Sequence, residues 1–475
     1  MDHQNLRNLR IKTPPFSPPL IFYFPRAHYP PSFPVPMNLT LESAPTTELF
    51  DTYVVPNYAR FPIAFERGEG AWVWDEAGRK YLDFGAGIAV CSIGHCHPRV
   101  VEAMSHQLSR LVHTSNLYYT RPQGLLARKL VELVGLAGKI FFCNSGAEAN
   151  EALFKLARKF GNDTLPVAPE HTVGELIEPQ RDRHTILTFT GSFHGRTLAG
   201  ISATGQDKVK KGFEPMVEGF AHVPYNDAPA LLAAMNRDVA AVLLEPIQGE
   251  SGIHPASAHF LRILREVCDR YGALLMFDEV QCGLGRTGDW CGWRSIAPDV
   301  VPDAVSWAKG IAGGFPLGAI WVRDRPLTLN SGGAISLADL FGPGTHGTTF
   351  GGTPLVCSGA LEVLRVIEEE GLLANARTIG AYAKESILGL KSPFITEVRG
   401  VGLMLGIQLT ASFATHAGSG TRPPSLWLVD RLHEAGMLTI PAGTHTIRWL
   451  PPLNVTRDEV DQAVAILGGV LRKNV

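Results

Sequence analysis

Lys309 has the setting that most clearly favours chemistry. It lies between Ala308 and Gly310 in VSWAKGIAGGFPLGAI, a stretch of small and apolar residues. Such surroundings lower the pKa of a lysine from about 10.4, and the neutral amine can then form a Schiff base with a carbonyl carbon. Most lysines are solvated surface charges, so this stretch alone does not establish the role.

Two acids, Asp278 and Glu245, each follow an apolar run directly. A buried carboxylate without a partner is costly. Each acid is therefore expected to cap a helix, to pair with an arginine or to face a protonated heterocyclic nitrogen. The residues alone leave these alternatives open.

The stretch NSGAEAN, residues 144–150, predicts a tight turn into an alanine-rich helix. Free backbone N–H groups at such a helix start favour a phosphate, although a plain helix cap explains the same residues. The turn is not a GxGxxG loop. Since no such loop follows an early strand with an acid about 20 residues later, a nucleotide-binding oxidoreductase is disfavoured.

The elements that must position these residues follow from the hydrophobic pattern. Residues 239–244 and 273–277 read as buried strands, and an amphipathic helix over 260–271, ended by Gly272, separates them. A strand, helix and strand in this order predict a parallel sheet, whose ligands bind at the carboxyl ends of the strands. The runs 139–143 and 185–190 predict further strands.

Composition restricts the class of protein. Of 475 residues, 45% are apolar and 19% charged, and the net charge of -2 gives no reason to expect a nucleic-acid partner. No apolar run approaches the roughly 18 residues of a spanning helix, so no membrane partner is expected. Seven cysteines without regular spacing predict a reducing compartment, namely the cytoplasm.

The first 36 residues differ from the rest because many prolines exclude a sustained helix or central strand. We expect a disordered arm. Its four basic residues against one acid suit a mitochondrial transit peptide, but the prolines oppose the amphipathic helix of such peptides. At the other end, Thr456 and Glu459 form a capping box that predicts a closing helix in a smaller terminal domain.

The stretch CSIGHCHPRV, residues 91–100, raises the question of a metal, since zinc prefers cysteine and histidine. His95, Cys96 and His97 are consecutive, and an extended backbone sends such side chains to alternating sides. We therefore expect a turn fixed by Gly94 and Pro98, and no metal site.

Seven motifs in order resemble the pyridoxal-phosphate-dependent class-III aminotransferases, closest to the ornithine and acetylornithine aminotransferase group. They are NSGAEAN, SFHGRT, EPIQGE, FDEVQCGLGRTG, WAKGIAGGFPLGA, HGTTFGGTPL and RWLPPL. The resemblance runs from about Thr47 to the C-terminus. It implies a fold-type-I α/β architecture, with a large wound, mostly parallel sheet domain and a smaller α+β domain built from N- and C-terminal segments.

The resemblance also implies domain boundaries. After the arm at 1–36, residues 37–90 would begin the small domain, residues 91–350 would form the large cofactor-binding domain, and residues 351–475 would complete the small domain. Two segments, 161–183 and 323–343, look longer than the usual connections of the family, and we expect surface loops there.

The resemblance assigns the cofactor, pyridoxal 5'-phosphate, to named residues. Lys309 would hold it covalently and then move the substrate proton, and Asp278 would pair with the pyridinium nitrogen. Gln281 would lie near the phenolic oxygen, and Phe193 would stack on the ring.

Backbone N–H groups of Gly146 and Ala147 would bind the cofactor phosphate. Thr349 would reach that phosphate from the neighbouring subunit, although the adjacent Thr348 leaves this assignment open by one position. The resemblance therefore implies a homodimer with its active site at the subunit interface.

Two arginines suit substrate carboxylates, which planar guanidinium groups bind bidentately. By resemblance, Arg448 takes the α-carboxylate of glutamate or 2-oxoglutarate, and Arg196 takes the distal carboxylate or that of the donor. Glu250 would neutralise Arg448 when the donor lacks a second carboxylate. Glu245 is also expected among the substrate-binding residues. Structural ion pairs are the alternative for both arginines.

Ile88 decides the expected donor, because ornithine-specific enzymes of the group carry a tyrosine there. An aliphatic residue suits an acylated amine, so we expect N-acetylornithine and 2-oxoglutarate to give N-acetylglutamate semialdehyde and glutamate in arginine biosynthesis. Tyr58 would be a second wall of the pocket, although a merely packed tyrosine is the alternative. Ornithine, succinylornithine and gamma-aminobutyrate remain alternative donors, and a non-catalytic binding protein is the alternative from another class.

Overall fold

The computed structural model describes residues 45–164, 183–416 and 420–473. The arm predicted at 1–36 and most of the loop predicted at 161–183 lie outside the described residues. The chain divides into two compact units, residues 1–64 and 65–475. In the first, helix α1 (Thr46–Tyr53) is followed by Arg60, whose guanidinium lies over the rings of Phe50 and Tyr58 at 4.9 and 5.6 Å.

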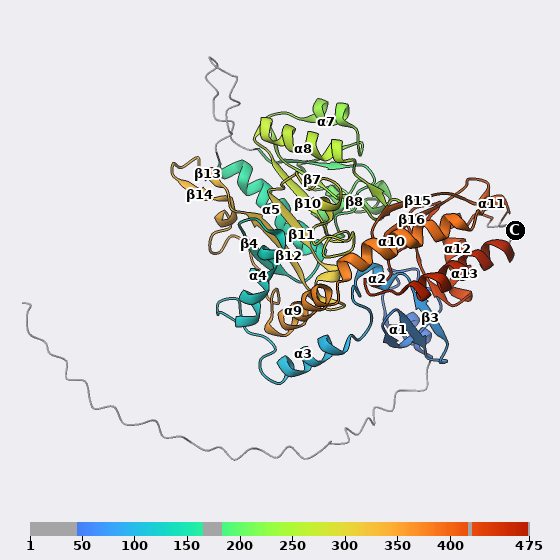
Figure 1. The fold of residues 1–475 in the computed structure, drawn as a ribbon. Helices are drawn as coiled ribbons and strands as arrows, with labels where there is room; N and C mark the ends of the chain where they lie inside the picture. The colour runs from blue at the N-terminus through green and yellow to red at the C-terminus, as the bar shows by residue number, and fades with distance from the viewer. Residues whose placement is uncertain (1–44, 165–182, 417–419, 474–475) are drawn as a thin grey trace, which may run out of the picture. The chain divides into compact units, whose positions relative to one another are not determined.

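A seven-stranded sheet forms the centre of the second unit (Figure 1), in the order β4-β12-β11-β10-β7-β5-β6. Only β12 among these strands runs antiparallel to its neighbours. The strands are β4 (Gly138–Cys143), β5 (Thr185–Phe189), β6 (Phe220–Val223), β7 (Val239–Leu244), β10 (Leu274–Asp278), β11 (Ala304–Trp307) and β12 (Gly318–Arg323). The predicted mostly parallel sheet is confirmed.

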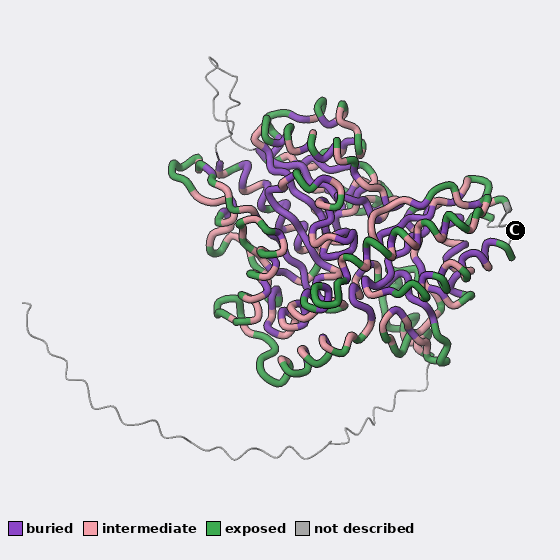
Figure 2. The backbone as a smooth tube through the Cα atoms, viewed as in Figure 1, coloured by how far each residue is buried: buried purple, intermediate pink, exposed green. Residues whose placement is uncertain are grey.

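Helices cover both faces of this sheet, so its central strands β7, β10 and β11 are buried along their whole length (Figure 2). Successive residues of β7 and β10 alternate between two cores. On one face the sheet packs against α5 (Gly146–Asp163), and on the other against α4 (Arg121–Val134), α8 (Ala258–Tyr271) and α9 (Pro354–Glu369). The predicted β7–α8–β10 crossover is present, with Gly272 ending α8 at a φ of +65°.

Two smaller sheets combine distant parts of the chain. The first has the order β1-β2-β3-β17, so a C-terminal strand pairs in parallel with an N-terminal one. The second has the order β15-β16-β19-β18. Their strands are β1 (Phe65–Glu69), β2 (Trp72–Asp75), β3 (Lys80–Asp83), β17 (Met437–Leu438), β15 (Ile395–Val401), β16 (Met404–Leu409), β18 (Ile440–Pro441) and β19 (Thr446–Trp449).

Helices of the C-terminal third pack around the second small sheet (Figure 1). They are α10 (Leu372–Gly389), α12 (Pro424–Glu434) and α13 (Arg457–Lys473). The predicted capping box begins α13, because the Thr456 hydroxyl accepts from Glu459 N at 3.2 Å and Glu459 accepts from Thr456 N at 2.9 Å. A smaller mixed α+β part beside the large sheet is therefore confirmed.

The remaining elements are short or lie at the edges. They are α2 (Ala86–Ala89), α3 (Pro98–Leu108), α6 (Leu198–Ala203), α7 (Ala228–Ala234), α11 (Phe413–His416), β8 (Ile247–Gln248), β9 (His254–Pro255), β13 (Pro326–Thr328) and β14 (Ala334–Ser336). Among the described residues, no helix combines the length and the hydropathy needed to cross a bilayer.

The segment 323–343 differs from the prediction of a surface loop. It forms the β13–β14 hairpin and then buries Leu337 and Leu340 in the core beneath α5. The glycines of the hairpin turn predict a loop, but burial of these two leucines against the core supplies the free energy that holds the segment there. The helix α9, which follows the boundary expected at 350, shares the core of the large sheet through Cys357, Ala360 and Leu364.

Candidate active site

A cavity of about 450 Å³ opens at the carboxyl ends of the central strands, where ligands of parallel sheets bind. Most of the predicted site residues line it. They are Gly146, Ala147, Phe193, Arg196, Glu245, Glu250, Asp278, Gln281 and Lys309. Five motifs that are distant in the sequence therefore converge on one cavity.

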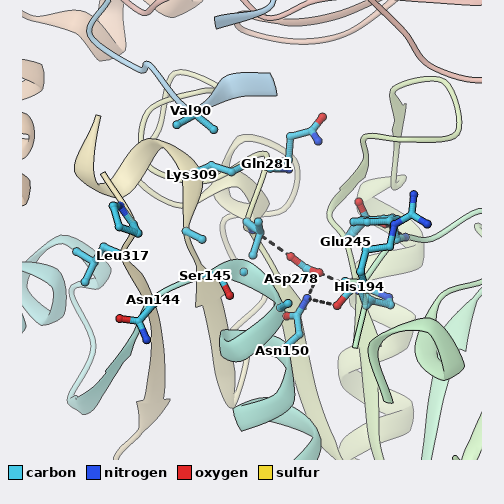
Figure 3. Close-up of a pocket in the computed structure, with 18 of the residues that line it drawn as sticks. Val90, Asn144, Ser145, Asn150, His194, Glu245, Asp278, Gln281, Lys309 and Leu317 are labelled. Carbon is cyan, nitrogen blue, oxygen red and sulfur yellow. Dashed lines mark hydrogen bonds and ion pairs between the residues drawn. The ribbon is translucent and has the colours of Figure 1, made fainter. Parts of the chain in front are cut away.

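Asp278 ends β10, and its carboxylate is 4% exposed. Its Oδ2 accepts from Asn150 Nδ2 at 2.7 Å and lies 2.8 Å from His194 Nδ1, while its Oδ1 accepts from Val280 N at 3.0 Å (Figure 3). Groups from α5 and from the loop after β5 thus fix the orientation of this acid relative to the cavity.

Asn150 and His194 are functional residues that the sequence did not single out, although both lie inside quoted motifs. Each is itself held in place: Asn150 Oδ1 accepts from Ser306 Oγ at 2.7 Å, and His194 N donates to Thr204 Oγ1 at 2.9 Å. The available signal was a polar Asn150 on the apolar face of α5. A buried amide needs a polar partner, and Asp278 is that partner.

Lys309 begins a short 3-10 turn after β11, with a φ of +47° that side chains rarely adopt. Burial lowers the pKa of Lys309 below its usual value, although Glu250 opposes this effect. A larger fraction of the amine is therefore neutral than for a surface lysine, as a nucleophile requires. Strain of this kind persists only where the surroundings enforce it, and it is common at active sites.

Arg448 and Glu250 form a bidentate ion pair. The distances are 2.7 Å from Nη1 to Oε1 and 3.1 Å from Nη2 to Oε2, and Arg448 is only 1% exposed. Arg448 Nη1 also donates to Gln281 Oε1 at 3.2 Å, and Gln281 Nε2 donates to Glu250 Oε1 at 3.3 Å. Burial raises the pKa of Glu250, but Arg448 outweighs this and holds it below its usual value.

Glu245 is buried, and its oxygens accept from backbone groups only: Phe193 N at 2.9 Å and Gly249 N at 3.2 Å. Burial raises the pKa of Glu245 above its usual value. The ring of Phe193 lies 5.5 Å from the Arg196 guanidinium carbon. Glu245 thus connects the loop carrying Phe193 and Arg196 to the loop carrying Glu250.

The start of α5 lies at one end of the cavity, where Ser145, Gly146 and Ala147 line the wall. The Ser145 hydroxyl accepts from Glu148 N at 3.2 Å, which confirms the tight capped turn. A side chain at Gly146 would come within 2.7 Å of Val280, so only glycine allows this close approach. The N-terminus of this 18-residue helix favours an anion in the cavity.

Four predicted residues do not line the cavity. Arg448 is paired with Glu250, and Glu250 lines the cavity. Ile88 packs against an apolar cluster that includes Ile247 and Ile253, while Val90, two residues later, does line the wall.

Thr349 is exposed, and its neighbour Thr348 accepts from Asn144 Nδ2 at 3.0 Å. Tyr58 belongs to the other compact unit and is 69% exposed. The roles predicted for these residues stay predictions.

In the stretch CSIGHCHPRV, the histidines make separate contacts. His95 Nε2 lies 2.8 Å from Asp83 Oδ2, whereas His97 Nε2 lies 3.4 Å from Glu370 Oε1. Over the part of the chain that the structure describes, no three cysteine, histidine or acidic side chains gather as a metal site would require.

A family model described as "Aminotransferase class-III" matches residues 53–471 of this chain. This chain is a class-III aminotransferase. An acetylornithine aminotransferase from Synechocystis is 44% identical over 88% of this chain and 91% of its own. Acetylornithine aminotransferase 1 from Bordetella bronchiseptica is 46% identical over 88% and 96%.

Solved structures support the family and the fold. The ornithine aminotransferase from Toxoplasma gondii superposes with a TM-score of 0.78 at 31% identity, covering 90% of this chain and 94% of that one. The N-acetylornithine aminotransferase from Stenotrophomonas maltophilia gives 0.70 at 35% identity, covering 90% and 98%. The predicted fold-type-I architecture is confirmed, and the oxidoreductase and non-catalytic alternatives are set aside.

The aminotransferase cofactor is pyridoxal phosphate, and the cavity fits it. A phosphate suits the start of α5, an aromatic face is offered by Phe193, and a protonated ring nitrogen suits the buried carboxylate of Asp278. The predicted cofactor is therefore confirmed for the family and compatible with these side chains.

Proposed function

We propose that this class-III aminotransferase moves the terminal amino group of N-acetylornithine to 2-oxoglutarate, giving N-acetylglutamate semialdehyde and glutamate, a reaction of arginine biosynthesis. The ion pair of Arg448 and Glu250 is the main support for this proposal. Glu250 lines the same cavity as the half-buried Lys309. The names and the 42–46% identity of the curated relatives support the choice of donor.

When bound, pyridoxal phosphate supplies a ring that accepts the electrons left on the substrate carbon after proton loss. Lys309 would hold the cofactor through its carbonyl carbon, and with its amine released it would serve as the base that carries the substrate proton. Its lowered pKa suits both tasks, because a neutral amine is nucleophilic and basic. Asp278 would pair with the ring nitrogen and stabilise its positive charge.

The other cavity residues orient the cofactor. Gly146 and Ala147 would donate backbone N–H groups to its phosphate, and Phe193 would stack on its ring. Gln281 would lie near the phenolic oxygen. Since Gln281 also contacts both Arg448 and Glu250, it connects the substrate carboxylate site to the cofactor site.

Arg448 and Glu250 let one pocket take two dissimilar substrates. With N-acetylornithine, Glu250 stays on Arg448 and neutralises it. With 2-oxoglutarate, the α-carboxylate of the substrate replaces Glu250 on the Arg448 guanidinium, and Arg196 binds the other carboxylate. With N-acetylornithine, Arg196 binds the carboxylate of the donor. A bidentate pair at the edge of a cavity, with Glu250 28% exposed, is suited to such an exchange.

The wall around residue 88 favours an acylated donor. Val90 supplies an apolar surface to the cavity, and Ile88, two residues earlier in the chain, packs against the apolar cluster that includes Ile247 and Ile253. A free α-ammonium group would lose hydration there without gaining a polar partner, whereas an amide loses less.

A homodimer completes the site. Thr349 lies outside the cavity of its own chain, in a loop joined to residues 113–116 because Asn116 Nδ2 donates to the carbonyl oxygens of Thr348 and Gly351 at 3.2 and 3.1 Å. Large apolar side chains are exposed in this loop and on either side of residues 113–116: Leu111, Val112, Leu117, Tyr118, Tyr119 and Phe350. Such a patch favours association with a second copy, which would bring Thr349 to the partner's phosphate site. Sedimentation equilibrium of the purified holoenzyme tests the dimer; a monomer contradicts it.

The working compartment is the cytoplasm, and the free state of all seven cysteines supports a reducing environment. Fractionation of the native cell tests this, and recovery of the protein in mitochondria would assign the arm at 1–36 as a transit peptide instead.

Donor preference is the decisive experiment. We expect kcat/KM for N-acetylornithine to exceed that for ornithine by about tenfold or more, the difference that one uncompensated charge in an apolar site produces. Succinylornithine and gamma-aminobutyrate complete the donor panel. A higher kcat/KM for ornithine would contradict the proposed donor and favour the activity named for the Toxoplasma neighbour.

A further inference from the structure

The residues of α2 form a left-handed turn, although three of the four carry a side chain. The φ angles of residues 86–89 are +44°, +64°, +66° and +62° in chain order. In this region Cβ approaches the next carbonyl oxygen, so only the surroundings can hold such a run in place. Backbone bonds from Ile88 N and Ala89 N to Gly85 O, at 2.8 and 3.1 Å, close the turn.

Asp83 holds the start of this turn. The residue ends β3 and is 5% exposed. Its Oδ1 accepts from Gly85 N at 2.9 Å and from Ala86 N at 2.8 Å, and its Oδ2 lies 2.8 Å from His95 Nε2. Both carboxylate oxygens are therefore engaged, and His95 determines how the carboxylate is rotated.

His95 is in turn fixed by the turn between β1 and β2. Its backbone N donates to Gly70 O at 2.8 Å, and its carbonyl accepts from Gly70 N at 3.1 Å. A side chain at Gly68 would come within 2.8 Å of the imidazole, so the ring packs directly on that backbone. Hydrogen bonds with Asp83 and then Cys91 raise the pKa of His95 to about 10. The contact with Asp83 is consequently a charged one at neutral pH.

The chain that leaves the turn forms part of the active site. Val90 lines the cavity, and Ser92 Oγ donates to Gly310 O at 2.9 Å, next to Lys309. A Cβ on Gly310 would lie 3.3 Å from Ser92 Cβ, so the two segments are in close contact. A change in the turn is therefore passed to the cavity wall and to the segment that carries the lysine.

We propose that His95 is a positioning residue: through Asp83 it holds the left-handed turn at 86–89, and thereby places Ile88 and Val90 for the amino donor. The proposal rests on the proposed function, since it assigns the turn to the donor side of the pocket. It gives the first histidine of the GHCHP motif a task at a distance from the cofactor.

The test compares holoenzymes of His95→Leu, His95→Gln and His97→Leu with the wild type. The leucine removes the N–H that faces Asp83, whereas the side-chain amide of glutamine can place a donor near the same position. We expect His95→Leu to raise KM for N-acetylornithine about tenfold with a change in kcat of less than about threefold, and glutamine to restore KM to within about threefold. His97 lies two residues after His95 and contacts Glu370 instead of Asp83. His97→Leu is therefore the control and should leave KM for N-acetylornithine unchanged.

A second readout uses no substrate. Hydrogen exchange of the peptide 84–92 should be about tenfold faster in His95→Leu than in the wild type, with no change in α5, because the supported turn opens locally. If the wild type does not use N-acetylornithine, the proposed function fails while this measurement still tests the positioning role.

Three results would overturn the proposal: wild-type donor KM in His95→Leu, equal KM effects in the leucine and glutamine variants, or unchanged exchange at 84–92. If His95→Leu does not fold, Asp83→Asn replaces it, because asparagine keeps an acceptor for Gly85 and Ala86 and loses the charge. Wild-type KM and exchange in Asp83→Asn would then refute the role equally.

Discussion

Replacing Glu250 with glutamine tests how one pocket accepts two substrates. Glu250 is the carboxylate that Arg448 contacts in this structure, and 2-oxoglutarate must displace it. A hydrogen bond between charged groups contributes about 1.5–3 kcal/mol. Because Glu250 is 28% exposed and partly screened, the lower end applies, and ~1.4 kcal/mol corresponds to about tenfold in a binding constant.

The two half-reactions should therefore respond in opposite directions. Glu250→Gln should tighten 2-oxoglutarate about tenfold, because its carboxylate no longer competes with a resident one. The donor half-reaction should weaken by a similar factor, because Arg448 is then a buried cation without a carboxylate. Single-turnover absorbance measurements with each substrate separate the two effects.

Two control variants show whether the charge at this position is responsible. Glu250→Asp keeps the charge on a shorter side chain and should retain the wild-type order of the two half-reactions. Asp299→Asn breaks a bidentate pair with Arg262 that is exposed at the surface and should change neither half-reaction. A Glu250→Gln enzyme in which both half-reactions change by one common factor would refute the exchange of partners on Arg448.

Three further predictions concern single residues. Lys309→Ala should remove both turnover and the visible absorbance of the lysine-bound cofactor while the melting temperature stays within about 5 °C, and an active variant would contradict its role. Asn150→Ala removes one of three donors to Asp278, so equilibrium dialysis should show cofactor affinity about tenfold weaker; unchanged affinity would make Asn150 merely structural. Burial raises the pKa of Glu279 to about 7, so the folded protein binds more protons than the unfolded chain between pH ~4.5 and ~7 and loses stability as pH rises through that window. Thermal unfolding of Glu279→Gln should lack this part of the pH dependence, and an identical profile would show that Glu279 does not titrate there.

The central elements were predictable because local and tertiary preferences agree. The strand β7 is apolar throughout, β10 is apolar up to its last residue Asp278, and α8 carries an apolar stripe that ends at Gly272. The segment 323–343 was mistaken for a surface loop because its turn residues are local signals. Burial of Leu337 depends instead on the position of α5, which no local pattern contains.

The candidate site shows the same limit. Asp278 and Glu245 were found because they directly follow apolar runs, and Lys309 because small and apolar residues surround it. The ion pair of Arg448 and Glu250 was expected from the resemblance. Asn150 was missed because it stands inside a helix whose apolar neighbours conceal one polar side chain directed at another element. The left-handed turn at 86–89 was missed for a stronger reason, since Ala86 and Ile88 have no intrinsic preference for positive φ.

Three acids line one cavity with a single lysine, yet their surroundings give them different properties. Glu250 has a guanidinium beside it that lowers its pKa, whereas Glu245 has only backbone donors and burial raises its pKa. Asp278 accepts from an amide, an imidazole and a backbone N–H, none of which requires a second charge in the cavity wall. Of these acids, Glu250 alone is paired with a basic side chain that a substrate carboxylate can take over, while Asp278 is kept for the cofactor. Burial lowers the pKa of Lys309 below its usual value, because Arg448 offsets the effect of Glu250, which raises that pKa.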